Sequence, residues 1–247
     1  MGKKGTDITA TGADAAGCAP ALEARGLTLA WDGVHDVVRG VDLHVMAGET
    51  VCIVGKSGCG KTTILHALSG LTRPREGVVL LHGEDLGGRP GLVSYMLQKD
   101  LLLPSRTILD NAVLPLVVAG QKKAAAREQA LPLFERFGLS GCENKWPGEL
   151  SGGMRQRAAF LRTYLMGNDV ALLDEPFSAL DALTRADIRA WYCRMAAELG
   201  IASVVITHDV DEAVGMASRV YVLEGDPRGG VPRTGAGEVR VGRPAAG

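Results

Sequence analysis

The fold of this chain is decided by the stretch Gly55-Lys56-Ser57-Gly58-Cys59-Gly60-Lys61-Thr62, which follows the apolar run Val51-Cys52-Ile53-Val54. The eight residues fit the pattern G-x-x-x-x-G-K-[ST], and the apolar run predicts a buried strand in front of them. A strand, a glycine-rich loop and a helix start therefore follow one another, as in loops that bind phosphate. An ordinary glycine-rich turn is the alternative, but it would not explain this context.

Each residue type of this phosphate loop, residues 55–62, suits a nucleotide. Glycines let the backbone fold tightly, so that its N–H groups converge on β- and γ-phosphate oxygens near the positive end of a helix. Lys61 adds a positive charge, and the hydroxyl of Thr62 can bind Mg²⁺. We expect all eight residues and the following Thr63 to bind the nucleotide.

A second apolar run, Val170 to Leu173, ends in Asp174 and Glu175 and is stopped by Pro176. Burying two carboxylates at a strand end without a cation would be costly. We therefore expect Asp174 to hold Mg²⁺ and Glu175 to orient and deprotonate the water that attacks the γ-phosphate. An acidic helix cap is the alternative interpretation.

A third predicted strand, Ser203 to Thr207, ends at His208. The helix after it should be capped by Asp209, with Glu212 reaching back to complete a capping box. Because ligands of open α/β sheets bind at the carboxyl edge, we expect His208 to contact the γ-phosphate or the attacking water. A histidine at a strand end can also be purely structural.

A second anion site is encoded by Leu150-Ser151-Gly152-Gly153-Met154, which we call the signature segment. Ser151 and the N–H groups behind Gly152 and Gly153 would open a helix toward a negative charge. One nucleotide needs one phosphate cradle, and this chain encodes two.

These elements, in this order, resemble the nucleotide-binding subunit of an ATP-binding cassette transporter over roughly Leu22 to Leu223. The resemblance implies an α/β fold, with a P-loop NTPase sheet core, an N-terminal antiparallel β subdomain and a helical signature-motif subdomain over about 99–165. It also implies ATP and Mg²⁺ as ligands, and ATP hydrolysis coupled to transmembrane transport.

The resemblance assigns roles to further residues. Gln98 matches the Q-loop glutamine, which binds Mg²⁺ and takes part in catalysis, and His208 matches the switch histidine. Ser178 to Asp181 matches the D-loop, which makes Asp181 a nucleotide-site residue. Trp31 occupies the place of the aromatic that stacks on adenine, and stacking of this kind barely discriminates between bases. Trp31 could instead pack at the edge of an N-terminal strand.

The resemblance also explains the second phosphate cradle. In the family, the signature segment of one subunit closes on the γ-phosphate held by the phosphate loop of its partner. The chain should therefore work as a dimer of cassettes, either with a second copy of itself or with a close relative. ATP would join the two subunits, and hydrolysis would loosen them.

In more detail, the sequence resembles the branch of this family that imports nitrate, sulfonates, taurine and thiamine precursors. The resemblance is clearest in residues 98–104, 107–111 and 177–185. Ser105 stands where that branch usually has tryptophan, and Arg162 to Leu165 replaces a pattern of small residues. The branch implies transmembrane permease subunits bound to the helical subdomain, indirect work with an extracytoplasmic solute-binding protein, and a place on the cytoplasmic face of the cell membrane. The cassette never touches cargo, so the substrate stays open.

Composition agrees with one large domain over 22–224, between a flexible tail at 1–21 and a polar tail at 225–247. At 247 residues and 46% hydrophobic content, the chain can bury on the order of 70% of its unfolded surface. A net charge of −1 gives no sign of the basic surface that nucleic-acid binding needs. Arg155 and Arg157 should form a local basic face, which we expect to support phosphate or the interface. No uncharged apolar run reaches the ~18 residues of a membrane span.

Two other functions compete with the transporter subunit. A soluble cassette ATPase acting on nucleic acid or ribosomes shares the phosphate-handling core, but this chain has no coiled-coil insertion, basic tail or second cassette. A small-molecule kinase can use the same phosphate loop, but the signature segment has no role there.

The chain between Gln98 and the signature segment should be helical over about 106–118 and 122–137. Pro115 and Pro132 fall inside these helices, and we expect them to bend or end the helices because proline lacks the N–H donor.

Overall fold

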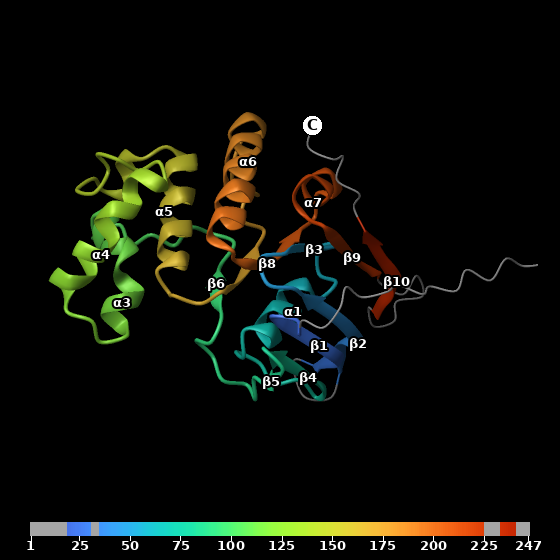
Figure 1. Cartoon of the computed structure of the whole chain (residues 1–247). Helices are drawn as coiled ribbons and strands as arrows, with labels where there is room; N and C mark the ends of the chain where they lie inside the picture. The colour runs from blue at the N-terminus through green and yellow to red at the C-terminus, as the bar shows by residue number, and fades with distance from the viewer. Residues whose placement is uncertain (1–18, 31–34, 225–232, 241–247) are drawn as a thin grey trace, which may run out of the picture.

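A computed structural model of the chain describes residues 19–30, 35–224 and 233–240. Two sheets and a group of helices make up this part of the molecule (Figure 1). One sheet has the strand order β2-β1-β4-β5, and the other has the order β10-β9-β3-β8-β7-β6. The strands are β1 Leu22–Ala30, β2 Asp36–Val45, β3 Thr50–Gly55, β4 Glu76–Leu81, β5 Glu84–Asp85, β6 Ser94–Met96, β7 Val170–Asp174, β8 Ala202–Thr207, β9 Arg219–Glu224 and β10 Arg233–Arg240.

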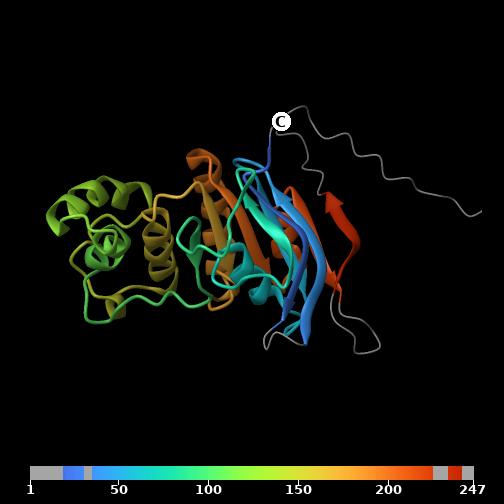
Figure 2. The same cartoon turned by 90° about the horizontal axis from the view of Figure 1, so that it is seen from below.

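The helices connect these strands and cover both faces of the larger sheet. They are α1 Lys61–Leu68, α2 Ile108–Ala112, α3 Leu114–Val118, α4 Lys123–Arg136, the 3-10 turn η1 Pro147–Glu149, α5 Gly152–Tyr164, α6 Ala182–Leu199 and α7 Val210–Met216. Figure 2 shows the green helices α2 to α4 at one end of the molecule, and the blue antiparallel strands toward the other end. The predicted α/β fold, with a parallel core, an antiparallel β sheet and a helical part, is confirmed.

The larger sheet is parallel from β9 to β6, and its inner strands are apolar because both faces are covered. Every residue of β7 and β8 is buried. Side chains of β3 alternate between two cores, since successive residues of a strand point to opposite faces. Val51 and Ile53 join the core of the antiparallel sheet and α1, whereas Cys52 and Val54 join the core under α5 to α7.

Strand β10 lies within the segment that the sequence predicts to be a polar tail. It pairs antiparallel with β9 at the edge of the larger sheet, from Arg233 opposite Glu224 to Arg240 opposite Arg219. Edge strands carry polar residues more readily than central ones, so composition alone does not distinguish such a strand from a tail.

The two prolines of the helical part behave differently. The predicted helix over 106–118 is split at Val113 into α2 and α3, and Pro115 lies in the first turn of α3, where its missing N–H leaves no bond unmade. Pro132 neither starts nor ends a helix, because α4 runs through it to Arg136. The carbonyl that Pro132 leaves without a donor belongs to Glu128, which is exposed and can bind water instead.

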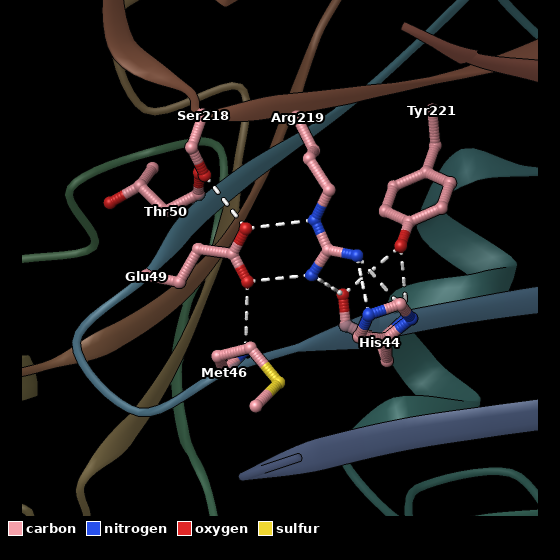
Figure 3. A network of polar contacts seen from close by, with 7 residues as sticks. All are labelled: His44, Met46, Glu49, Thr50, Ser218, Arg219 and Tyr221. Atoms are coloured by element: carbon pink, nitrogen blue, oxygen red, sulfur yellow. Dashed lines mark hydrogen bonds and ion pairs between the residues drawn. The ribbon is translucent and has the colours of Figure 1, made fainter. Parts of the chain in front are cut away.

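A polar network ties the end of β2 to the starts of β3 and β9, as Figure 3 shows. The guanidinium of Arg219, only 6% exposed, donates to both carboxylate oxygens of Glu49, at 2.8 and 2.6 Å. Glu49 also accepts from the Ser218 hydroxyl at 2.7 Å and from the Met46 N–H at 2.8 Å. Arg219 in turn reaches the carbonyl of His44 at 3.1 Å. The antiparallel sheet is thereby fastened to the parallel one.

We expect Glu49→Gln to destabilise the fold, because it leaves the buried Arg219 without its counter-ion. Breaking a buried ion pair typically costs about 3–5 kcal/mol. Burial alone would raise the pKa of Glu49, but the bonds from Arg219, the Met46 N–H and Ser218 outweigh it, so the pKa lies below the ordinary 4.5. A lowered pKa stabilises the fold above pH 4.5, and this contribution is lost as the pH falls through the folded value.

Urea unfolding of wild type and Glu49→Gln between pH 7 and pH 3.5 would test this. The gap in unfolding free energy should be constant near neutrality and shrink in acid. Glu128→Gln, which changes an exposed carboxylate of α4, is the control and should leave the unfolding free energy almost unchanged. A gap that stays constant into acid would contradict the assignment.

Candidate functional site

The phosphate loop leaves β3 at Gly55 and enters α1 at Lys61. Gly58 and Gly60 have φ values of 80° and 94°, a backbone region that residues with a side chain rarely adopt. A Cβ atom at Gly60 would also lie 2.5 Å from a methyl carbon of Val38. Glycine is therefore required at this turn for two independent reasons.

Lys61 points back over the loop that precedes it. Its side chain is buried, and its ammonium group donates to the carbonyls of Gly55 at 2.8 Å and Lys56 at 3.0 Å. Among the other loop residues, Lys56 and Ser57 are exposed, whereas Cys59 and the following Thr63 are buried. The positive charge is thus held at the loop, at the start of α1.

Thr62 and Asp174, two of the three residues expected to bind Mg²⁺, are brought together from α1 and β7. The Thr62 hydroxyl donates to Asp174 Oδ2 at 3.0 Å. Burial raises the pKa of Asp174 and the neighbouring Glu175 carboxylate adds to the rise, although the bond from Thr62 opposes it. A hydroxyl and a poorly solvated carboxylate are hard oxygen ligands of the kind that Mg²⁺ takes together with phosphate oxygens, so the donor set fits this ion.

Glu175 is the meeting point of three loops. Its Oε2 accepts a hydrogen bond from the Gln98 side-chain amide at 3.1 Å and lies 3.4 Å from His208 Nδ1. The Glu175 side chain is 17% exposed and that of His208 is 56% exposed. Glu175 has a φ of 44°, unusual for a residue with a side chain, and its N–H bonds to the Ile206 carbonyl at 3.0 Å. The predicted catalytic residues therefore share one site.

The His208 loop is held by its neighbours on both sides. Asp209 caps α7 as expected, accepting from the Glu212 N–H at 3.0 Å. The expected reach of Glu212 back to Asp209 is wrong, because the Asp209 N–H already bonds to the Thr207 hydroxyl at 3.1 Å. The Glu212 carboxylate instead accepts from that hydroxyl, and burial raises the pKa of Glu212. The part that Thr207 plays here is not predictable from the sequence, where its only signal is its place at the end of the strand.

The signature segment and the phosphate loop are carried by different elements: the segment opens α5, whereas the loop joins β3 to α1. Ser151 caps α5 by accepting from the Met154 N–H at 3.3 Å, and a Cβ on Gly153 would lie 3.0 Å from a methyl carbon of Thr184. Figure 1 shows α5 beside the helical group, whereas α1 lies below the larger sheet. The two phosphate cradles are thus not assembled into one site within this chain.

Other predicted residues have separate surroundings. Asp181 caps α6, accepting from the Thr184 N–H at 3.0 Å, and this bond lowers the pKa of Asp181. Trp31 lies outside the described residues, and so do most of the predicted tails at 1–21 and 225–247.

The expected basic face of Arg155 and Arg157 is engaged within the chain. The guanidinium of Arg157 lies 5.0 Å from the centre of the Trp191 ring on α6. Arg155 Nε lies 3.3 Å from an oxygen of the Asp100 carboxylate. Packing of α5 against its neighbours thus engages both guanidinium groups, and their expected support of phosphate or the interface stays a prediction.

A family model described as ABC transporter matches residues 38–178, more than half of the chain. The chain is 38% identical over 201 residues to a formylaminopyrimidine import ATP-binding protein of Halalkalibacterium halodurans, covering 81% of this chain and 78% of that protein. It is 40% identical over 204 residues to an aliphatic sulfonates import ATP-binding protein of Shouchella clausii, covering 80% of this chain and 78% of the relative.

Two solved structures are similar in fold and sequence. One is a dimeric bacterial ABC transporter cassette, with a TM-score of 0.73, 25% identity, and coverage of 90% of this chain and 99% of the other. The second, 26% identical with the same TM-score and coverage, is a dimeric post-hydrolysis state of an ATP-binding cassette bound to ADP and Pi.

No helix in the described part of the chain is long and apolar enough to cross a membrane.

The family match, the two relatives and the dimeric cassettes agree with the phosphate loop, the acidic end of β7 and the signature segment. This chain belongs to the ABC transporter family.

Proposed function

We propose that this chain is the ATP-binding and ATP-hydrolysing subunit of an ABC importer of small solutes. The observation that carries the proposal is the convergence of Gln98 and His208 on Glu175, next to the contact between Thr62 and Asp174. The close spacing of these groups, at the carboxyl edge of a parallel sheet and beside the phosphate loop, suits phosphoryl transfer to water.

The residues of the phosphate loop, Lys61 among them, would bind the β- and γ-phosphates. The buried Cys59 and Thr63 would support the loop from inside. Thr62, Asp174 and Gln98 would hold Mg²⁺, which neutralises charge on the phosphate oxygens when it is bound. Glu175 would accept a proton from the attacking water at Oε2, the oxygen that Gln98 and His208 orient. Trp31 is proposed to stack on adenine.

The active form would be a dimer of cassettes. In each half, Ser151, Gly152 and Gly153 would face the γ-phosphate bound to the partner, and Asp181 would lie at the same interface. The dimeric state of the two similar solved cassettes supports this arrangement. A second copy of the chain is the simplest partner, since the signature segment and the phosphate loop are both present in it.

The names of the relatives, which refer to import of formylaminopyrimidine and of aliphatic sulfonates, support an import function for small solutes of this kind. The partners would be transmembrane permease subunits, and an extracytoplasmic solute-binding protein would act through them. The chain would then lie at the cytoplasmic face of the cell membrane. We assign residues 22–224 to the ATPase domain and about 99–165 to its helical subdomain.

Affinity purification of the tagged chain from detergent-solubilised membranes of its own organism, with mass spectrometry of bound proteins, would test this. We expect a multi-span permease and Mg²⁺-dependent release of phosphate from ATP by the purified complex. Recovery of ribosomal or DNA-bound partners without a permease would instead favour a soluble cassette ATPase. The same sample should be prepared from untagged cells to identify background binding.

A further inference from the structure

Residues 99–107, which follow Gln98 and which we call the Gln98 loop, form neither helix nor strand. The loop contains a strained residue. Leu101 has a φ of 45°, in the left-handed region that residues with a side chain rarely adopt. Leu101 is exposed, so burial of its own side chain does not hold this conformation. Something else must keep the backbone of residues 99–101 in place.

Arg162, on α5, supplies that restraint. Its guanidinium donates to the Leu101 carbonyl at 2.8 Å and also to the Asp100 carbonyl. Burial lowers the pKa of Arg162, while the Asp100 carboxylate opposes this. A guanidinium with two donors in a fixed plane can hold two consecutive carbonyls at once, which a lysine ammonium cannot do with the same rigidity.

Arg155 adds a second link from the same helix. It lies seven residues before Arg162, two turns away on the same face. Its Nε is 3.3 Å from Asp100 Oδ2, and its Nη1 donates to the Leu150 carbonyl at 2.8 Å. Leu150 immediately precedes Ser151, so one side chain touches both the Gln98 loop and the start of the signature segment.

The far end of the loop is held independently. The buried Asn111 accepts from the Leu103 N–H at 2.6 Å and donates to the Leu103 carbonyl at 3.1 Å. Removing Arg162 should therefore loosen residues 99–101 without unravelling the chain that follows them, where Leu102 is buried.

We infer that Arg162 is a positioning residue for hydrolysis, acting through Gln98. By docking the backbone of Asp100 and Leu101 on α5, it keeps the Gln98 amide against Glu175. Because the same helix begins with the signature segment, the group that orients the base and the group that faces the partner's phosphate are carried by one rigid element. The inference rests on the proposed ATPase function.

The test is a double-mutant cycle in the purified complex, with Arg162→Ala, Gln98→Ala and the double variant. Arg162→Ala should lower kcat for ATP hydrolysis by roughly 10–100-fold, the scale of a small misplacement of a catalytic group. KM for ATP should stay within about twofold, since the phosphate loop is untouched. The double variant should be no slower than Gln98→Ala alone, because both changes remove the same contact.

Arg162→Lys should restore kcat in part, and it is the variant to use if Arg162→Ala does not fold. Arg127→Ala is the matched control: it removes a guanidinium that pairs with Asp110 at 2.7 Å in the same group of helices, away from the Gln98 loop, and should keep wild-type kcat. Losses that multiply in the double variant, or an unchanged kcat in Arg162→Ala, would overturn the inference. An inactive wild type would instead count against the proposed function itself.

Discussion

Glu175→Gln is expected to slow ATP hydrolysis by about 10²–10⁴-fold, the usual contribution of a general base. The amide keeps the shape of the side chain and an oxygen that can still accept from Gln98, as Glu175 does at 3.1 Å. It cannot take a proton from the attacking water at neutral pH. Binding should survive, because neither the phosphate loop nor the contact between Thr62 and Asp174 is altered.

Single-turnover hydrolysis of ATP would measure this effect. Size-exclusion chromatography with and without ATP would show whether the variant forms a dimer. We expect the variant to accumulate as an ATP-bound dimer, since the γ-phosphate that joins two cassettes is no longer removed. Glu128→Gln, an exposed change on α4, should hydrolyse ATP like wild type. Turnover close to normal in Glu175→Gln would exclude Glu175 as the base.

Lys61→Ala should act one step earlier, on nucleotide binding itself. The variant loses a charged donor to phosphate, and hydrogen bonds to charged groups are worth about 1.5–3 kcal/mol, or roughly 10–150-fold in Kd. It also loses the bonds from Lys61 to the carbonyls of Gly55 and Lys56. The loop should therefore be less ordered as well as less positive.

Titration calorimetry with ATP and Mg²⁺ gives the affinity directly. Lys122→Ala, an exposed lysine at the start of α4, is the control for loss of one positive charge. Thermal unfolding of both variants should accompany the titration, so that a weakened fold is not mistaken for a weakened site. An unaltered ATP affinity in Lys61→Ala would show that the phosphate cradle is wrongly assigned.

Local sequence was enough to predict the phosphate loop and the strand ends. Glycine is needed at residue 60 for its own φ, and Lys61 and Thr62 follow it on the first turn of a helix, so the pattern is readable within eight residues. Asp174 and His208 were predicted for a similar reason, since each ends or follows an apolar run that predicts a buried strand. Family resemblance was needed for Gln98, which no local pattern singles out.

Contacts between distant segments could not be predicted. Arg162 and Asp100 are 62 residues apart, and nothing around either residue indicates that they meet. The Thr207 hydroxyl accepts from the Asp209 N–H, the donor that Glu212 was expected to bind. The Glu212 carboxylate accepts from the Thr207 hydroxyl instead. The ion pair of Glu49 and Arg219 spans 170 residues and appears only when β3 and β9 lie side by side.

By itself, the sequence determined the chemistry of this protein, because phosphate binding depends on short runs in which each residue's backbone preference and functional group act locally. The tertiary structure alone decided the geometry around Glu175. The order β9-β3-β8-β7-β6 brings the loops after four strands to one edge, and helix α5 then holds the Gln98 loop through Arg162. Such positions arise from packing across the whole fold, and no single stretch of sequence encodes them.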